Sequence, residues 1–166
     1  MNQINDIEEI YIDNYKIVYK YLLANSHNKD VAEELTQETF YRAVKNINKF
    51  KGDSKISSWL CQIAKNLWLA EIKRNKHFKE IDEKDIVISD YDVLASEDKI
   101  NLYKKIQQLD TETRDVIYLR LSGELTFKEI SEIMNKTESW VRVTFYRGKE
   151  KLKLKENIEN ERKQRL

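Results

Sequence analysis

A short basic stretch and the segment after it combine side chains that suit unpaired nucleic acid. In KGDSK, Gly52 stands between cationic and polar residues, and Trp59 follows shortly after. Lysine side chains form ion pairs with the phosphates of a strand, and aromatic rings stack on its bases. Short polar side chains hydrogen-bond the exposed edge of an unpaired base. The residues expected to contact or melt DNA here are Lys51, Asp53, Ser54, Lys55, Trp59, Gln62, Lys65, Asn66 and Lys73. The competing interpretation is a simple connector, with Trp59 packed in the core.

The C-terminal part offers a second nucleic-acid surface of a different kind. LTFKEISEIMNKTESWVRVTFYRGKEKLK predicts a short helix, a turn and a longer helix. One stripe of the longer helix is apolar and the opposite stripe is polar and basic, as in a helix that enters a major groove. That face comprises Thr137, Ser139, Arg142, Val143, Tyr146, Arg147 and Lys149. A helical hairpin with a solvated basic face is the alternative, and Trp140 either packs beside the hairpin or contacts the DNA backbone.

An acidic stripe precedes both of these surfaces. Glu34, Gln37 and Glu38 stand at i, i+3 and i+4, so one side of a helix presents them together. Carboxylates repel DNA, so this stripe suits a basic protein partner or has no partner at all.

Catalytic chemistry finds little support in the sequence. It has no paired carboxylates at metal-binding spacing, no glycine-rich phosphate loop and no nucleophile beside a base. Cys61 is the single cysteine, and His27 and His77 stand far apart, so neither a disulfide nor a zinc cluster is expected. We therefore expect no enzyme, no metal or other cofactor and no small-molecule substrate.

The sequence also lacks the patterns of secretion and membrane insertion. Its N-terminus has no basic start followed by an apolar run, and no uncharged apolar stretch reaches about 18 residues. A soluble cytoplasmic protein is expected.

Helices must position all of these side chains. The chain has no proline and three glycines, which favours an all-helical fold. Apolar spacing and capping signals predict helices at 6–23, 30–48, 56–75, 97–108, 111–121, 126–134 and from 137 onward. Asp30 with Glu33, and Thr126 with Glu129, are expected to form capping boxes.

The expected organisation is two small helical domains joined by a linker. Basic blocks at 42–76 and 138–166 are separated by acidic sequence, which suggests two polyanion contacts. The first domain covers residues 1–76, an acidic linker covers 77–96, and the second domain, with the helix-turn-helix, covers 97–166.

Two long motifs resemble a known family. AEELTQETFYRAVKNINKFKGDSKISSWLCQIAKNLWLAEIKRNK is similar to region 2 of bacterial RNA polymerase sigma factors of the extracytoplasmic-function (ECF) group, in the sigma-70 family. LDTETRDVIYLRLSGELTFKEISEIMNKTESWVRVTFYRGKEKLK is similar to their region 4. Trp140 stands where the family usually has a small residue, and Val143 with Thr144 replaces a more polar or basic pair.

The resemblance implies a role for each surface. The segment ELTQE would bind the clamp helices of the large subunit of core RNA polymerase. The 49–57 loop and the helix after it would capture a flipped base and melt the −10 element. Region 4 would read the −35 element of promoter DNA and contact the polymerase flap. The family also implies an anti-sigma factor, often membrane-anchored. A stand-alone helix-turn-helix transcriptional regulator is the alternative function.

Overall fold

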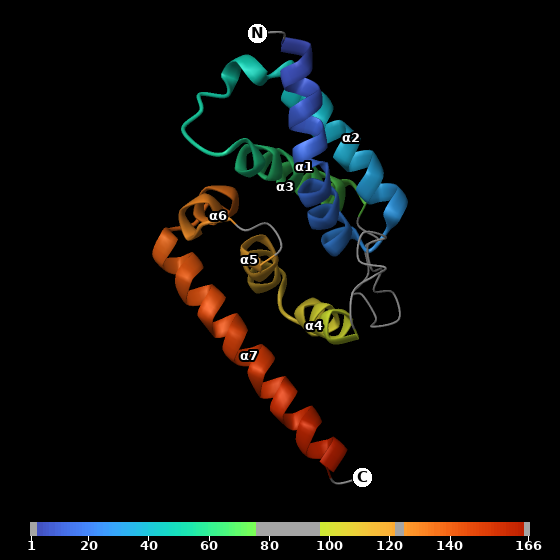
Figure 1. Ribbon diagram of the computed structural model, residues 1–166, viewed down its shortest axis with the longest axis vertical. Coiled ribbons are helices and arrows are strands. Elements are labelled where there is room, and N and C mark those ends of the chain that lie inside the picture. The colour runs from blue at the N-terminus through green and yellow to red at the C-terminus, as the bar shows by residue number, and fades with distance from the viewer. Residues whose placement is uncertain (1–2, 76–96, 122–124, 165–166) are drawn as a thin grey trace.

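Two groups of helices form the part of the chain that the computed structural model describes, residues 3–75, 97–121 and 125–164. These residues contain no strand, so the all-α fold class is confirmed. The first group consists of α1 (Gln3–Ser26), α2 (Lys29–Lys45), a 3-10 turn (Ile47–Lys49) and α3 (Ile56–Arg74). The second consists of α4 (Glu97–Gln107), α5 (Thr111–Leu121), α6 (Phe127–Met134) and α7 (Glu138–Gln164). Figure 1 shows α6 lying beside α3, where the groups meet.

The first group closes around a core to which all three of its helices contribute. Leu22 of α1, Leu60 of α3 and Ala32 of α2 are fully buried. Cys61 is buried among them, and this burial raises the pKa of its thiol to about 12. The thiol therefore stays protonated and packs as a small apolar side chain.

The start of α2 differs from the expected capping box. Asn28, not Asp30, is the N-cap, and its Oδ1 accepts hydrogen bonds from the backbone N–H groups of Asp30 at 2.9 Å and Val31 at 3.1 Å. His27, with φ 51°, turns the chain immediately before it. The helix also ends at Lys45, earlier than expected, because Asn46 folds back and donates its side-chain N–H to Arg42 O.

The second group is built around α5. Its Val116, Ile117 and Leu119 are fully buried. α7 crosses α5 at Gly148, where an added Cβ would lie 2.7 Å from both Ile117 Cδ1 and Thr113 Cγ2. Gly148 lies on the apolar stripe of α7, and its missing side chain allows this close approach of the two helices.

The boundaries expected for the two domains stay predictions. The linker at 77–96 lies outside the described residues, and so does Gly123, a residue type suited to end the helix expected at 111–121. Among the helices that are described, none combines the length and apolar character needed to cross a bilayer.

Candidate nucleic-acid interface

Local hydrogen bonds fix the helix-turn-helix of α6 and α7. Thr126 Oγ1 accepts from Glu129 N at 3.2 Å, and Glu129 Oε2 accepts from Thr126 N at 2.7 Å, which confirms the capping box. Asn135 adopts the left-handed conformation with φ 52° and ψ 45° and turns the chain. Thr137 Oγ1 then accepts from Trp140 N at 3.1 Å and caps α7. These features set the direction in which α7 leaves the turn.

The outer face of α7 gathers the residues expected to contact duplex DNA. All of them are exposed: Thr137, Ser139, Arg142, Val143, Tyr146, Arg147 and Lys149. The opposite stripe, which includes Val141 and Phe145, is buried. The Arg142 guanidinium donates to Glu138 Oε1 at 2.9 Å, and its central carbon lies 4.7 Å from the Phe127 ring centroid. These contacts hold Arg142 over the outer face.

Two aromatic neighbours of this face have roles that sequence reasoning did not assign. Phe127 contacts two cations, because the Arg120 guanidinium lies 4.8 Å from its ring centroid in addition to that of Arg142. Trp140 is half-buried, and Lys136 Nζ lies 5.0 Å from its ring centroid. Trp140 thus packs beside the hairpin. Arg120 and Phe127 belong to different helices, α5 and α6, so their approach gave no sequence signal.

The glycine turn, residues 49–55, owes its shape to Gly52. This residue has φ +74°, and a Cβ built on it would meet nothing within 4 Å. Glycine is therefore favoured by backbone conformation rather than by lack of space. Lys51, Asp53 and Lys55 project into solvent around it, and Ser54 is half-buried.

Trp59 anchors the glycine turn. Its ring centroid lies 5.1 Å from that of Phe50, and it lines a small apolar cavity with Val44 and Ile47. The side chain is half-buried against the core of the first helix group. The ring therefore supports the turn from within, which is the core-packing alternative.

The remaining expected contacts form the α3 strip, which consists of Gln62, Lys65, Asn66 and Lys73. These positions fall on one side of the helix. Asn66 and Lys73 are exposed, whereas Lys65 is half-buried. Burial lowers the pKa of Lys65, and the carboxylates of Asp115 and Glu112 oppose this effect.

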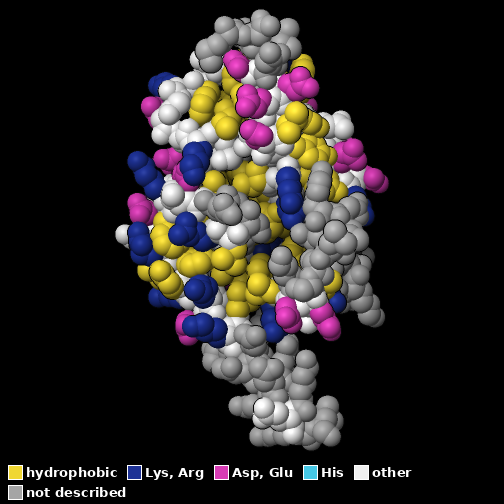
Figure 2. All heavy atoms as spheres, viewed as in Figure 1, with side chains coloured by type: hydrophobic (Ala, Val, Ile, Leu, Met, Phe, Trp, Pro, Cys, Tyr) yellow, Lys and Arg dark blue, Asp and Glu magenta, His cyan; other side chains and the backbone are white. Residues whose placement is uncertain are grey.

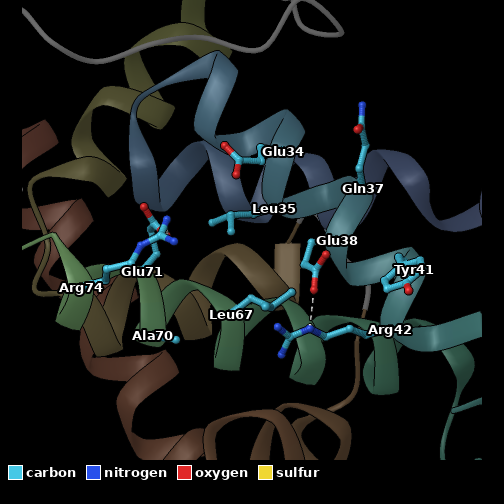
Figure 3. A pocket seen from close by; sticks show the side chains of 10 residues that line it. All are labelled: Glu34, Leu35, Gln37, Glu38, Tyr41, Arg42, Leu67, Ala70, Glu71 and Arg74. Atoms are coloured by element: carbon cyan, nitrogen blue, oxygen red, sulfur yellow. Dashed lines mark hydrogen bonds and ion pairs between the residues drawn. The ribbon is translucent and has the colours of Figure 1, made fainter. Parts of the chain in front are cut away.

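The acidic stripe borders a groove between α2 and α3 with a volume of about 480 Å³ (Figure 3). Glu34, Gln37 and Glu38 line its α2 side, and Leu35 and Leu67 lie between the two helices. The full lining is Glu34, Leu35, Gln37, Glu38, Tyr41, Arg42, Leu67, Ala70, Glu71 and Arg74. The groove is therefore an apolar floor with charged walls.

Ion pairs on both walls were missed by sequence reasoning. Arg42 Nε donates to Glu38 Oε1 at 2.6 Å, and Arg74 Nη2 donates to Glu71 Oε2 at 2.6 Å. Both pairs follow the i+3 and i+4 spacing of helix neighbours, so the signal was present in the sequence. They leave Glu34 as a carboxylate on the α2 wall that is not engaged by Arg42.

Charge separates over the surface. Figure 2 shows Lys and Arg side chains over α6 and the first half of α7, whereas Asp and Glu side chains gather near the N-terminal end of α1. A chain with formal net charge +1 thus carries local fields of both signs. Such a pattern suits polyanion contact on one part of the molecule and basic protein contact on another.

Comparison with known proteins assigns both helix groups. The model for Sigma-70 region 2 matches residues 10–78, and the model for Sigma-70, region 4 matches residues 99–152. The ECF RNA polymerase sigma factor SigM of Bacillus subtilis is 32% identical over 160 residues, covering 89% of this chain and 93% of its own length. SigW of Bacillus subtilis is 33% identical over 164 residues, covering 89% of this chain and 86% of its own length.

The fold agrees with these matches. The sigma factor RpoE of Bartonella quintana, solved in complex with the anti-sigma factor NepR, matches with a TM-score of 0.73 over 89% of this chain and 94% of that chain. At 18% identity this likeness concerns the fold alone.

These matches define the class of protein first. It is a DNA-binding transcription factor of two regions, a helical module with a lysine-bearing turn followed by a helix-turn-helix module. The order and extent of the matches are more specific. The chain belongs to the sigma-70 family and is an RNA polymerase sigma factor of the ECF group. The family expected from the sequence is confirmed, and a stand-alone regulator is disfavoured because the first module is itself a sigma region.

Proposed function

We propose that this sigma factor is a non-catalytic subunit that binds core RNA polymerase, directs it to promoters through −10 and −35 elements, and promotes DNA melting. The observation that carries the proposal is the presence of two chemically different DNA surfaces on separate helical modules. One is a preformed helix face, and the other is a lysine-bearing turn that continues into a polar helix strip.

The outer face of α7 reads the −35 element as duplex. Arg142 is held in one orientation by Glu138 and Phe127, which reduces the entropy lost when it hydrogen-bonds a base. The exposed Val143 and Tyr146 supply apolar contact, as thymine methyl groups require. The exposed Lys149 forms ion pairs with the phosphates of the DNA backbone.

The glycine turn and the α3 strip take the melted −10 element. The left-handed Gly52 projects Lys51 and Asp53 away from the core, and Trp59 fixes the base of the turn. Lysines neutralise the strand, and the amides of Gln62 and Asn66 can hydrogen-bond unpaired base edges.

The groove between α2 and α3 receives the clamp helices of the polymerase large subunit, and the second module contacts the flap. The groove combines an apolar floor with charged walls on which Glu34 is not engaged by Arg42, so it suits an amphipathic helix that places a basic side chain beside Glu34. Glu34, Gln37 and Glu38 would make these contacts.

An anti-sigma factor, either soluble or membrane-anchored, would hold the protein inactive in the cytoplasm. RpoE of Bartonella quintana, which shares this fold, was solved with the anti-sigma factor NepR. This fold likeness supports the existence of such a partner and leaves its identity open.

Transcription from a promoter by purified core polymerase and this protein tests the proposal. The double variant Lys51→Ala with Ser54→Ala should reduce permanganate reactivity of the bubble, while Lys45→Ala, a matched exposed lysine on α2, should not. Arg142→Ala should weaken −35 binding by about 5- to 150-fold, the range expected for one bidentate base contact. Lys153→Ala, about three turns further along α7, is its control.

Binding to core polymerase is measured separately. The charge reversal Glu34→Lys should weaken the complex, whereas Glu33→Lys, which is exposed on the same helix but outside the groove, should leave it unchanged. Absence of promoter-specific initiation by the wild-type holoenzyme would refute the proposal. A tight, site-specific duplex shift by the free protein would instead favour the stand-alone regulator.

A further inference from the structure

Two helix faces of opposite charge lie open to solvent at separate places on the molecule. One is the α1 face, which consists of Glu8, Glu9, Ile12 and Asp13 in the N-terminal half of α1. The other is the outer face of α7 described above. Figure 1 shows the N-terminal end of α1 apart from α7, so the two faces do not cover each other within one chain.

The α1 face places one apolar side chain among carboxylates. Ile12 is 66% exposed, more than any other large apolar side chain that the structure describes. By helical spacing it lies one turn after Glu8 and between Glu8 and Glu9 around the helix axis. These residues and Asp13 border a shallow hollow of about 230 Å³. Single exposed apolar residues are ordinary, so the charges around Ile12 are what make this face distinctive.

The carboxylates of the α1 face are not neutralised. Glu8, Glu9 and Asp13 are exposed and form no ion pair with any residue that the structure describes. Two carboxylates of the groove between α2 and α3 are, in contrast, paired with arginines. The α1 face is therefore free to bind a basic surface.

The outer face of α7 has the complementary composition. Val143 is 47% exposed and Tyr146 is 53% exposed, and they are neighbours on the helix surface at i and i+3. Arg147 and Lys149 lie beside them, are exposed, and form no ion pair with a described residue. This face therefore has an apolar centre beside free cations.

The carboxylates of α7 do not cancel this positive charge. Glu138 Oε1 lies 2.9 Å from Arg142 Nη2, and Glu150 Oε1 lies 3.7 Å from Lys153 Nζ. Each of these carboxylates is matched by a cation of the same helix. The two remaining cations thus leave the outer face net positive.

We propose that the two faces bind each other between two copies of this chain, so that the α1 face of one copy lies on the outer face of α7 of the next. Ile12 then packs on Tyr146 and Val143. The carboxylates around Ile12 face Arg147 and Lys149. An apolar centre with a charged rim is typical of protein interfaces, and tyrosine is one of their commonest anchors.

Charge selects a second copy as the occupant of the α1 face. DNA has the wrong sign, since its phosphates and these carboxylates repel each other. The groove proposed for core polymerase is formed by α2 and α3, not by this part of α1. The outer face of α7 matches the α1 face in charge, in apolar content and in helical form, and every copy of the chain carries it.

The pairing is head-to-tail because the two faces differ. A copy bound through α1 leaves its own α7 free for a third copy, so such contacts give open chains unless a ring closes. Two single helix faces bury less area than a standard interface. We therefore expect a weak association with a dissociation constant on the order of 10 μM.

The pairing has one functional consequence, and only this consequence rests on the function proposed above. Tyr146, Arg147 and Lys149 cannot contact a second copy and the −35 duplex at the same time. Self-association therefore withdraws part of an abundant pool from promoters, and dilution releases it. The association itself requires neither DNA nor polymerase.

Sedimentation equilibrium of the full-length protein at about 1 to 100 μM tests the association, since this range brackets the expected constant. Glu9→Lys changes the α1 face, and Arg147→Glu changes the outer face of α7. Glu33→Lys, an exposed site on α2 that belongs to neither face, is the matched control. Mass that rises with concentration is expected for wild type and for the control.

Each face variant should associate about tenfold more weakly, because one charge reversal replaces attraction by repulsion. Raising the salt concentration from about 0.1 M to about 1 M shortens the Debye length from about 10 Å to about 3 Å. The wild-type association should therefore weaken as well at the higher salt concentration.

Mixing the two face variants is the decisive measurement. Glu9→Lys keeps an intact outer face on α7, and Arg147→Glu keeps an intact α1 face. A 1:1 mixture should therefore associate with about the wild-type constant, although each variant alone associates weakly. Recovery in the mixture also shows that both variants are folded.

Three results would overturn the proposal: a wild-type protein that stays monomeric at about 100 μM, a Glu33→Lys variant as impaired as Glu9→Lys, or a mixture that regains no association. A monomeric wild type whose Glu9→Lys variant loses core polymerase would assign the α1 face to the polymerase instead. Failure of the proposed function would look different, as absence of initiation with core polymerase whatever the mass of the free protein.

Discussion

Asp115 makes the stability of this protein depend on pH in an unusual direction. Its carboxyl group is buried on α5, facing Tyr21 and Asn25 of α1 and Lys65 of α3, with Arg114 beside it in the chain. Burial raises its pKa from 3.8 to about 6, and these neighbours reverse only part of the effect. Because the folded state holds the proton more tightly than the unfolded state, this group favours folding fully below pH about 3.8 and loses that contribution as pH rises through about 6.

The magnitude follows from the same values. One pKa unit corresponds to about 1.4 kcal/mol, so a rise from 3.8 to about 6 costs the charged folded state about 3 kcal/mol. Asp115→Asn keeps the shape and an oxygen that can accept from Tyr21, but it cannot ionise. Relative to wild type, the variant should gain about 2.5 kcal/mol in its free energy of unfolding between pH 4 and pH 7.5, because a small part of the effect is already present at pH 4.

Urea unfolding followed by tryptophan fluorescence at several pH values measures this difference. Subtracting wild type from variant at each pH cancels the titration of every other group. Asp13→Asn, which removes an exposed carboxylate from α1, is the matched control. A difference for Asp115→Asn that stays constant from pH 4 to pH 7.5 would show that Asp115 does not hold its proton in the folded state.

Local features of the helix-turn-helix give three further predictions for urea unfolding. Thr126→Ala removes the cap of α6 and should cost about 1 kcal/mol, and no loss would mean that the capping box is not formed. Gly148→Val forces a branched side chain against Ile117 and Thr113 and should cost about 1–3 kcal/mol, whereas an unchanged midpoint would contradict the close helix approach. Asn135→Ala should cost about 1–2 kcal/mol because of the left-handed backbone, while Asn135→Gly should be near neutral; equal effects would refute that reason.

The helix-turn-helix was predictable because its determinants are local. The capping box of Thr126 and Glu129 spans four residues, and Asn135 and Thr137 act on backbone groups within three positions of themselves. Gly148 falls on the apolar stripe of α7 by spacing alone. Each of these signals lies within a single turn or a single helix, so no tertiary knowledge was needed.

The start of α2 shows where local reasoning stops. Asn28 and Asp30 are both good cap residues two positions apart, and the pattern of Asp30 with Glu33 favoured the second. The structure has Asn28 as the N-cap. His27 turns the chain in the left-handed conformation just before it, and Asn28 has the extended conformation that a cap requires. A positive φ at histidine is uncommon and carries no sequence signal that would outweigh a capping box.

The candidate site divides in the same way. Exposure along the outer face of α7 follows from helical periodicity and was predicted. The direction in which Trp59 packs was left open, because position 59 borders both the core and the polar side of α3 and its neighbour Phe50 belongs to another element. The contact of α6 with Gln62 and Lys65 joins residues about seventy positions apart, beyond the reach of any spacing argument.

That long-range contact uses only part of the polar side of α3, because Asn66 and Lys73 of the same strip stay exposed. A face that only packed against α6 would be more stable if it were apolar, since buried polar pairs seldom exceed well-packed hydrophobic groups in stability. A face that only contacted DNA would not need the backbone carbonyl of Glu132 as an acceptor for the Gln62 amide. The amide of Gln62 and the amine of Lys65 contact a backbone carbonyl and a thioether of α6, and the same donors can serve a nucleic acid strand. An apolar replacement at Lys65 removes an ammonium group from the α3 strip, so it should impair capture of the melted strand while leaving the helices packed.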